Sequence, residues 1–384
     1  MKGIYLDNAA STPVDPSVLE TLNRAFSDCY GNASSMHSNG TEAKELLEHS
    51  RDKLATILNC HPDELYFTSG GTEANNWALK GFAFANSSKG NHIIISSIEH
   101  ECVQNACRWL RHRGFQITQI PVDVTGILNP ESVEKAITDK TILISVMHVN
   151  NEIGTIQPIQ EIGQIARDSK IAFHTDACQS FGKIPIDAGT MAVDLISINA
   201  HKIYGPKGTG ALFIRKGIQI EPLLHGGGQE RGLRSSTENI PGIAGFVKAA
   251  ELCQVMQVEE QVRIDQLCKK LISRLTGEFE NVYFNGNQEK RVPGIVNFAF
   301  SGQEGQAIRV LLMLDEESIF VSTGSACSSN HSDSNGSHVL NAIGRNPVEA
   351  RGAIRVSIGR FNTETDIDFF CDTLFRIMKK LQSN

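Results

Sequence analysis

Between about residues 60 and 215, short apolar runs alternate with longer segments whose apolar residues recur at helical spacing. Such short runs are typical of buried strands, and the segments between them are typical of amphipathic helices. Strands separated by helices predict parallel pairing with right-handed crossovers, and therefore an α/β chain. The strands are predicted at residues 65–69, 92–97, 116–121, 141–146, 171–175, 194–198 and 211–214.

The rest of the chain has a different order of elements. Residues 243–279 carry apolar and charged residues at helical spacing, which predicts one long helix leading into a second unit. Because 384 residues exceed one typical domain, we expect a large domain at 15–255 and a smaller one formed by 1–14 with 256–384. The smaller domain should contain the segment 291–301, a helix at 305–314, a strand at 353–357 and a final amphipathic helix at 365–381.

Lys202 is the most informative single position. It follows the apolar run 193–197 and precedes a glycine-rich turn, where a strand would deliver its last side chain to a pocket. A buried lysine loses the solvation that favours its charge, so its amine becomes nucleophilic and can form a Schiff base with pyridoxal phosphate (PLP). The alternative is an ordinary lysine at a strand edge.

Further polar side chains stand where other predicted strands end. Asp176 and Gln179 follow one strand, and an aspartate there is suited to keeping the pyridine nitrogen of PLP protonated. Thr72 follows a Gly-Gly turn at the start of a predicted helix, whose free N–H groups suit a phosphate. Helix capping explains Asp176 and Thr72 equally well when each is taken alone.

His100 and Asn151 follow two more of the predicted strands. Parallel strands present their carboxyl ends at one edge of a sheet, so both side chains should lie near Lys202. Glu99 and Glu101 flank His100 and should favour its imidazolium form. The alternative for His100 is a surface residue.

The composition excludes several classes of function. The net charge of −7 argues against general nucleic-acid binding. The first residues lack an apolar core of signal-peptide length, and no stretch approaches the ~18–20 apolar residues of a membrane span. The nine cysteines include no Cys-x-x-Cys pair and the twelve histidines no His-Glu-x-x-His pattern, so we expect neither a resident metal nor a disulfide framework. We therefore expect a cytoplasmic location.

Cys327 lies in a stretch rich in serine, asparagine and glycine, at residues 322–337. Such residues cannot repay the entropy of being ordered, so the composition predicts a mobile loop. A cysteine there is either an incidental thiol or a nucleophile carried on a moving segment.

Taken together, these segments resemble the class I cysteine desulfurases of the nitrogen-fixation and iron–sulfur-assembly type. These are fold type I PLP enzymes of the class V aminotransferase superfamily. The resemblance covers nearly the whole chain, from residues 5–13 to residues 354–361, and it includes residues 31–37, residues 225–237 and the Ser-Ala-Cys sequence of Cys327 in the loop. It implies a large domain with a mostly parallel central sheet and a smaller α+β C-terminal domain.

The resemblance also implies a role for individual residues. Lys202 would bind PLP covalently, and His100 would stack over the ring and move protons. Cys327 would attack the sulfur of L-cysteine, keep it as a persulfide and let L-alanine leave. The other cofactor-binding residues would be Gly71, Thr72, Asn151, Asp176, Gln179, Asn199, His201 and Thr237, and the substrate-binding residues Arg355, Asn151 and Asn8.

Partners follow from the same resemblance. Thr237 implies a homodimer, because in the family it reaches the cofactor phosphate from a second subunit. A sulfur-acceptor protein, such as an iron–sulfur scaffold, should dock near the Cys327 loop and the C-terminal helix, and Cys327 could share a nascent cluster with it. Asn199 departs from the serine or threonine common in the family, although an amide also donates to phosphate.

Other interpretations stay open at this stage. A class V aminotransferase or a selenocysteine lyase would keep the fold and change the chemistry, and an aminotransferase would not need Cys327. A non-catalytic scaffold in a sulfur-transfer complex is opposed by Lys202, Asp176 and His100. The sequence does not identify the acceptor or the downstream pathway.

Overall fold

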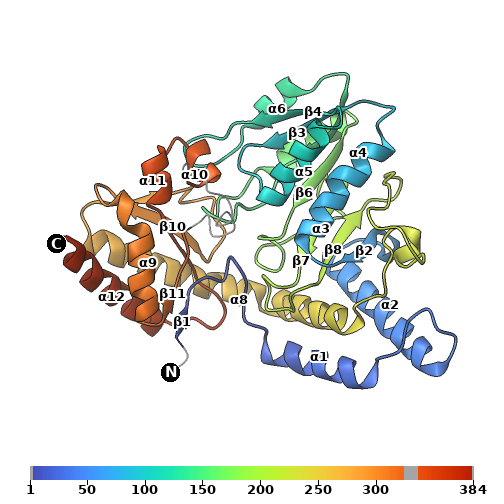
Figure 1. Cartoon of the computed structure of the whole chain (residues 1–384), viewed down its shortest axis with the longest axis horizontal. Coiled ribbons are helices and arrows are strands. Elements are labelled where there is room, and N and C mark those ends of the chain that lie inside the picture. Colours follow the sequence, from blue (N-terminus) through green and yellow to red (C-terminus); the bar gives the residue numbers. More distant parts are fainter. Residues whose placement is uncertain (1–2, 324–335, 383–384) are drawn as a thin grey trace.

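The computed structural model describes residues 3–323 and 336–382. Its largest element is a seven-stranded sheet with the strand order β2-β8-β7-β6-β5-β3-β4 (Figure 1). Every predicted strand of this region is confirmed to within one residue at each end. The strands are β2 (Leu65–Thr68), β3 (His92–Ser96), β4 (Gln116–Ile120), β5 (Thr141–Ser145), β6 (Ala172–Asp176), β7 (Leu195–Asn199) and β8 (Gly210–Ile214).

Parallel pairing is confirmed for β4, β3, β5, β6 and β7, but it is wrong for β8. Strand β8 runs antiparallel to both β7 and β2. The chain passes from β7 to β8 through residues 200–209, a loop without a helix. A parallel return needs a crossover of about a dozen residues or more, so this loop permits only the antiparallel return.

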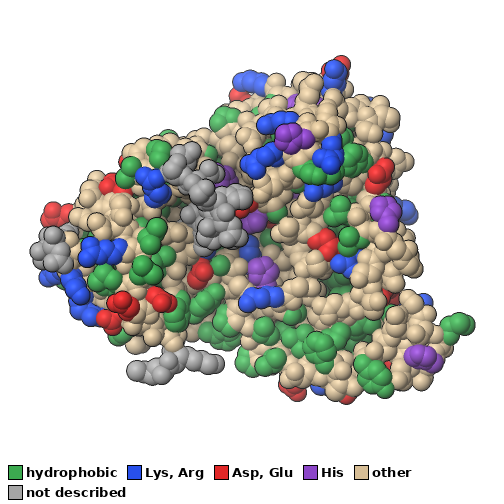
Figure 2. Space-filling model, viewed as in Figure 1, with side chains coloured by type: hydrophobic (Ala, Val, Ile, Leu, Met, Phe, Trp, Pro, Cys, Tyr) green, Lys and Arg blue, Asp and Glu red, His purple; other side chains and the backbone are tan. Residues whose placement is uncertain are grey.

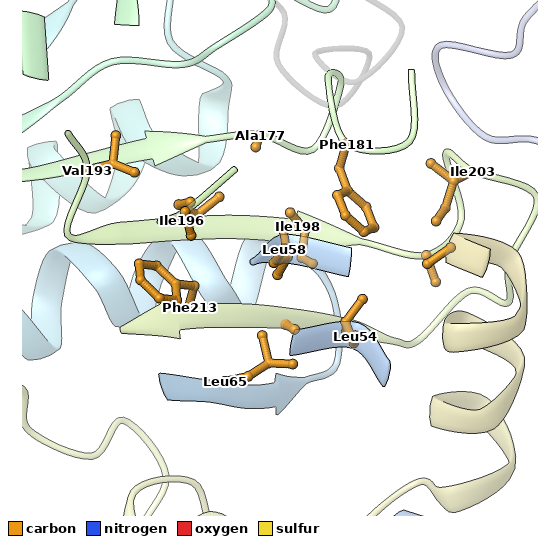
Figure 3. Close-up of a cluster of buried hydrophobic side chains, with 14 of the residues drawn as sticks. Leu54, Leu58, Leu65, Ala177, Phe181, Val193, Ile196, Ile198, Ile203 and Phe213 are labelled. Carbon is orange, nitrogen blue, oxygen red and sulfur yellow. The ribbon is translucent and has the colours of Figure 1, made fainter. Parts of the chain in front are cut away.

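Helices cover both faces of the sheet, because side chains of successive strand residues point to opposite faces. On one face, Ile94 and Ile196 pack with α1, α2, α6, α7 and the first part of α8, and Figure 3 shows α2 side chains against β7 and β8. On the other face, Ile93 and Leu195 pack with α3, α4 and α5. The bounds are α1 (Pro16–Asp28), α2 (Ser38–Leu58), α3 (Gly71–Asn76), α4 (Phe82–Ala85), α5 (Glu101–Arg111), α6 (Pro130–Ala136), α7 (Ile159–Asp168) and α8 (Ile240–Glu278).

A second apolar cluster lies around a three-stranded antiparallel sheet of order β12-β10-β9 and the parallel pair β1-β11. The predicted long helix is confirmed as α8, which contributes to the first cluster with Phe246 and to the second with Leu271 (Figure 1). The domain limits at 15–255 and at 1–14 with 256–384 stay a prediction. The bounds are β1 (Ile4–Tyr5), β9 (Val282–Asn285), β10 (Ile295–Phe300), α9 (Ala307–Glu316), β11 (Ile319–Phe320), α10 (His338–Ala342), α11 (Pro347–Arg351), β12 (Ile354–Ser357) and α12 (Glu364–Gln382).

None of the helices in the described part of the chain combines the length and the apolar character that a membrane crossing requires.

A buried ion pair fixes the loop that follows β8. Arg51 of α2 donates from Nη1 and Nη2 to the two carboxylate oxygens of Glu230, at 2.8 and 2.7 Å. Glu230 Oε2 also accepts the backbone N–H of Phe67 at 2.8 Å, and Arg51 donates to the carbonyl of Leu65 at 2.9 Å. Both charged side chains are 2 % exposed. The pair therefore joins the loop to β2, next to the Gly-Gly turn.

We expect Arg51→Met to lower the free energy of unfolding by about 3–5 kcal/mol, because it leaves the Glu230 carboxylate buried without its partner. Chemical denaturation monitored by circular dichroism measures the loss. Lys269→Met is the matched control, since the exposed Lys269 pairs with Asp265 on one helix face and should change stability by less than about 1 kcal/mol. Equal losses in the two variants would contradict the prediction.

Candidate active site

A cavity of about 480 Å³ lies at the carboxyl ends of β5, β6 and β7. This is the edge of a parallel sheet where ligands bind in α/β folds. Figure 2 shows histidine side chains gathered near the centre of the face, between the two units. Of the residues predicted from sequence, the cavity brings together Gly71, Thr72, His100, Asn151, Asp176, Asn199, His201, Lys202 and Arg355.

The Gly-Gly turn forms one end of the cavity. Gly70 has φ 149° and Gly71 begins α3, so the N–H groups of the first turn of α3 lie beside the cavity. Glu73 stabilises this turn: it accepts the N–H of Ser69 at 2.8 Å and a two-bond contact from Arg234, at 2.7 and 3.0 Å. Although burial opposes it, hydrogen bonds from Arg234 and Ser69 lower the pKa of Glu73. The loop that follows β8 therefore stabilises the turn through Arg234.

Close packing explains why glycine stands at position 71. A Cβ there would overlap Cys178 Sγ and would lie 3.4 Å from Asn199 Nδ2. The backbone of α3 therefore approaches the ends of β6 and β7 more closely than any other residue would permit.

Asp176 is the last residue of β6 and is 5 % exposed. Its Oδ1 accepts the N–H of Cys178 at 2.9 Å, but a turn and not a helix follows, so Asp176 is not a helix cap. Its Oδ2 accepts Nδ2 of Asn75 at 2.7 Å. These two bonds fix the carboxyl group at the floor of the cavity.

Lys202 lies in the turn after β7, and its neighbours are tied to the N-terminal segment. The N–H and hydroxyl of Thr12 both donate to the carbonyl of His201, at 2.8 and 2.9 Å. Burial, then the charge of Lys202, lowers the pKa of His201 to about 4, so its imidazole is neutral at neutral pH. Lys202 lines the large cavity and also a second, smaller one on its other side.

His100 is the N-cap of α5. The expectation that its ring is a charged imidazolium is wrong. Burial, followed by the charge of Lys202, lowers the pKa of His100 and favours the neutral ring. The expected support from Glu99 fails because burial raises the pKa of that carboxyl group to about 8. His100 Nδ1 accepts the backbone N–H of Cys102 at 3.2 Å, so the neutral ring carries its proton on Nε2.

Arg355, on β12, is 3 % exposed. Its Nη2 donates to Asp7 Oδ1 at 2.7 Å and its Nη1 to the carbonyl of Asn151 at 2.9 Å. Its Nε is buried and has no hydrogen-bond partner among the described residues. Arg355 therefore lines the cavity with its guanidinium fixed at two points and its Nε–H left without a protein partner among the described residues.

Three predicted site residues do not line the large cavity. Gln179 lies behind its wall, with Nε2 donating to the carbonyl of Ala9 at 2.8 Å. Asn8 donates to the carbonyl of Ser357 at 2.8 Å and lines the smaller cavity. Thr237 is exposed to solvent. Cys327 lies outside the described residues.

The cavity also contains residues that the sequence reasoning missed, among them Asn75, Cys102, Cys178 and Thr209. Asn75 could have been found, because it stands one helical turn after Gly71 and so shares its face of α3. Burial raises the pKa of the Cys102 thiol to about 12 and raises that of Cys178 well above its usual value. Both therefore stay protonated and are poor nucleophiles.

The residues present fit PLP. Some of the buried polar atoms without partners among the described residues belong to side chains that line the cavity: Asn75 Oδ1, Asn199 Oδ1, Thr209 Oγ1 and Arg355 Nε. Unpaired buried polar atoms are rare in proteins and indicate a polar ligand. The cavity volume is within the range of cofactor sites. The described residues contain no cluster of three metal-ligating side chains.

Comparisons with known proteins agree with this site. Residues 4–370 match the family described as aminotransferase class-V. A curated relative, cysteine desulfurase IscS of Dictyoglomus turgidum, is 48 % identical over 381 residues, which cover 99 % of this chain and 95 % of the relative. A structure described as a NifS-like protein has a TM-score of 0.92 at 37 % identity and covers 98 % and 99 % of the two chains. The structure of SspA in complex with cysteine has a TM-score of 0.83 at 37 % identity, covering 94 % and 100 %.

We expect Gly71→Ala to weaken PLP binding about 5- to 100-fold, because overpacking costs about 1–3 kcal/mol and the new methyl group would overlap Cys178 Sγ. Titration of the cofactor-free protein with PLP, followed by absorbance, measures the affinity. The double variant Gly71→Ala, Cys178→Ala should recover most of it.

Gly277→Ala is the control, since a Cβ at Gly277 meets nothing within 4 Å. A Gly71→Ala variant that binds PLP as tightly as the parent would show that the close approach of α3 is not required.

Proposed function

Because the chain belongs to the class V aminotransferase family, we propose that it is a PLP-dependent cysteine desulfurase. It removes sulfur from L-cysteine, releases L-alanine and keeps the sulfur as a persulfide on Cys327. The observation that carries the proposal is the convergence of Lys202, Asp176, His100 and Arg355 on one cavity. The similarity to desulfurases over nearly the whole chain supports the same activity.

When bound, PLP supplies an aldehyde that reacts with amines and a ring that accepts electrons. The residues of this chain would hold it at three points. Lys202 would bond covalently to the aldehyde carbon, and the carboxyl group of Asp176 would pair with the pyridine nitrogen. Thr72 and the N–H groups at the start of α3 would bind the phosphate.

His100 moves protons as an uncharged ring. Its Nδ1 is occupied by the N–H of Cys102, so Nε2 is the nitrogen that donates a proton and later takes one back. Arg355 binds the substrate carboxylate. Asp7 and the carbonyl of Asn151 orient the guanidinium.

Cys327 is assigned by its position in the chain. On one side of residues 324–335, Ser322 pairs with Arg355 through two backbone bonds, at 2.6 and 3.2 Å. On the other side, His338 Nε2 lies 2.9 Å from the carbonyl of Glu99, the residue before His100. An extended chain from Ser322 to Cys327 spans at most about 17 Å. Both attachment points lie next to residues that line the cavity, Arg355 and His100.

The overall reaction balances with these parts alone. The Cys327 thiol forms an S–S bond with the substrate sulfur while the substrate C–S bond breaks. The products are L-alanine and Cys327 with a persulfide, and no external oxidant or reductant is needed.

We expect Lys202→Ala to lose covalently bound PLP, and Cys327→Ser to keep PLP while sulfide release falls on the order of 10³-fold or more. Absorbance spectra and sulfide assays in a reducing buffer measure the two effects. With ³⁵S-labelled cysteine, the parent protein should carry label on Cys327 and pass it to a thiol acceptor.

Cys29→Ser is the control, because Cys29 lies on α1's C-terminal end, away from the cavity. Full turnover in Cys327→Ser would identify an aminotransferase instead, and a protein that binds no PLP would identify the scaffold. Turnover of selenocysteine well above that of cysteine would assign a lyase.

We also infer that the enzyme is a homodimer. Thr237 is exposed on its own chain and is therefore free to reach a second copy. Apolar side chains gather over α1 (Figure 2), where Leu19 and Phe26 stand two turns apart and are 51 % and 64 % exposed. Tyr30 and Met36 continue this surface at 74 % and 98 %. Exposed apolar surface of this kind is typical of protein–protein interfaces.

Sedimentation velocity should give twice the mass of one chain, and Leu19→Glu with Phe26→Glu should shift the protein toward monomer, because two charges would be buried in the interface. Val124→Glu, at an exposed apolar position in a turn, should leave the dimer unchanged. A parent enzyme that is active as a strict monomer would end this inference.

The sulfur acceptor is expected to dock beside the Cys327 segment and α12, where Phe369 is 46 % exposed. An iron–sulfur scaffold protein fits this role, with Cys327 as a shared ligand of the nascent cluster. We infer a cytoplasmic location, since the cysteines in the described part of the chain are unpaired and a reducing compartment suits a persulfide.

A further inference from the structure

A second cavity, of about 40 Å³, lies on the other side of Lys202. Its lining includes Lys183, Lys202, Tyr204, and Gln257, Glu260 and Gln261 of α8. It has room for about two or three water molecules, and although most of its lining is apolar, these polar side chains offer hydrogen bonds to water. The side chains of Lys183 and Lys202 therefore line the same small cavity.

Lys183 is held in place at its amine and at its backbone. Its Nζ donates to Gln179 Oε1 at 2.8 Å, and its carbonyl accepts Nε2 of Gln261. The other end of the Gln179 amide donates to the carbonyl of Ala9 at 2.8 Å, so the orientation of the amide is fixed. The amine of Lys183 is therefore held at the Gln179 amide, while other atoms of its side chain line the small cavity.

The amine of Lys183 has no counter-ion. No carboxylate within residues 3–323 and 336–382 forms an ion pair with it, and the one carboxylate of the small cavity, Glu260, binds Arg360 at 2.5 and 3.2 Å. Lys183 is half-buried, so its ammonium loses part of its solvation without gaining a counter-ion, and this favours the neutral amine.

The groups around Lys183 together favour its neutral form. Burial, followed by the charge of Lys202, lowers the pKa of Lys183 to about 7; Cys253 on α8 opposes this shift, and Arg355 adds a smaller contribution to it. The charge of Glu260 is balanced by Arg360. His201 is neutral above its pKa of about 4. At neutral pH, Lys183 can therefore give and take a proton with equal ease.

We propose that Lys183 is the proton-transfer partner of Lys202, and that the two amines exchange a proton through the small cavity. The inference rests on the proposed function, in which Lys202 alternates between a bond to the cofactor and a free amine. In the transfer, protonated Lys202 gives one proton to neutral Lys183, and the reverse step returns it. No other bond changes.

A purely structural role would make Lys183 only a support for Gln179. The two roles differ in what restores activity. If Lys183 transfers protons, a small amine diffusing into the space left by Lys183→Ala should replace it, whereas an amine cannot restore the position of the Gln179 amide.

The test compares Lys183→Ala and Lys183→Met with Lys44→Ala, which changes an exposed lysine of α2. Both Lys183 variants should lose on the order of 10²-fold in kcat. Methylamine and ethylamine should restore part of the loss in Lys183→Ala but not in Lys183→Met, where the space stays filled. The pH profile of kcat should lose its change near pH 7 in both. Full activity of Lys183→Met, or loss of activity without rescue by any amine, would overturn the proposal.

A second measurement does not depend on turnover. Competitive labelling of the cofactor-free parent protein with acetic anhydride, read by mass spectrometry across pH, should give Lys183 a midpoint near pH 7. A midpoint near the ordinary lysine value of about 10.4 would overturn the proposal. An inactive parent protein with a Lys183 midpoint near 7 would instead reject the proposed function while leaving the shared cavity intact.

Discussion

The buried guanidinium of Arg355 is the interaction on which the site depends most. It binds Asp7 of the N-terminal segment and the carbonyl of Asn151 after β5, while its own strand belongs to the smaller sheet. A charge that is 3 % exposed needs a partner, so these three parts of the chain cannot separate without leaving it unpaired. The cavity is therefore formed between two apolar clusters that this contact and α8 hold together.

Much of this arrangement could be predicted because the sheet is buried on both faces. Buried strands appear in the sequence as short apolar runs, and their ends carried the polar residues that the cavity brings together. The direction of β8 could not be read from its composition, since it depends on the short loop 200–209. The predicted charge of His100 was wrong, because the sequence shows its charged neighbours but not its burial, and burial lowers its pKa. The contacts of Gln179 and Asn8 involve carbonyl groups, which leave no trace in a sequence.

Burial raises the pKa of three thiols, those of Cys102 in the large cavity, Cys253 in the small cavity and Cys107. It raises the pKa of Cys102 and Cys107 to about 12 and that of Cys253 to about 11, so each stays a thiol at neutral pH. A protonated thiol is a weak nucleophile, and none of these residues competes for the sulfur of a substrate. A desulfurase built on this fold therefore needs its reactive cysteine on a segment outside the apolar clusters.

Lys202 lines two cavities, and each would serve a different role of its amine: bonding to a ligand or transferring a proton. The larger cavity, with Arg355 and Asp176, has the size and polarity for a cofactor and an amino acid. The smaller one accommodates only water and is reached from the side of α8. The amine of Lys202 must bond to a ligand and must also gain and lose protons. If the ligand and the proton pathway occupied the same space, a bound ligand would block proton transfer. Because Lys183 stands on the side away from the substrate, protons can pass while the larger cavity is occupied.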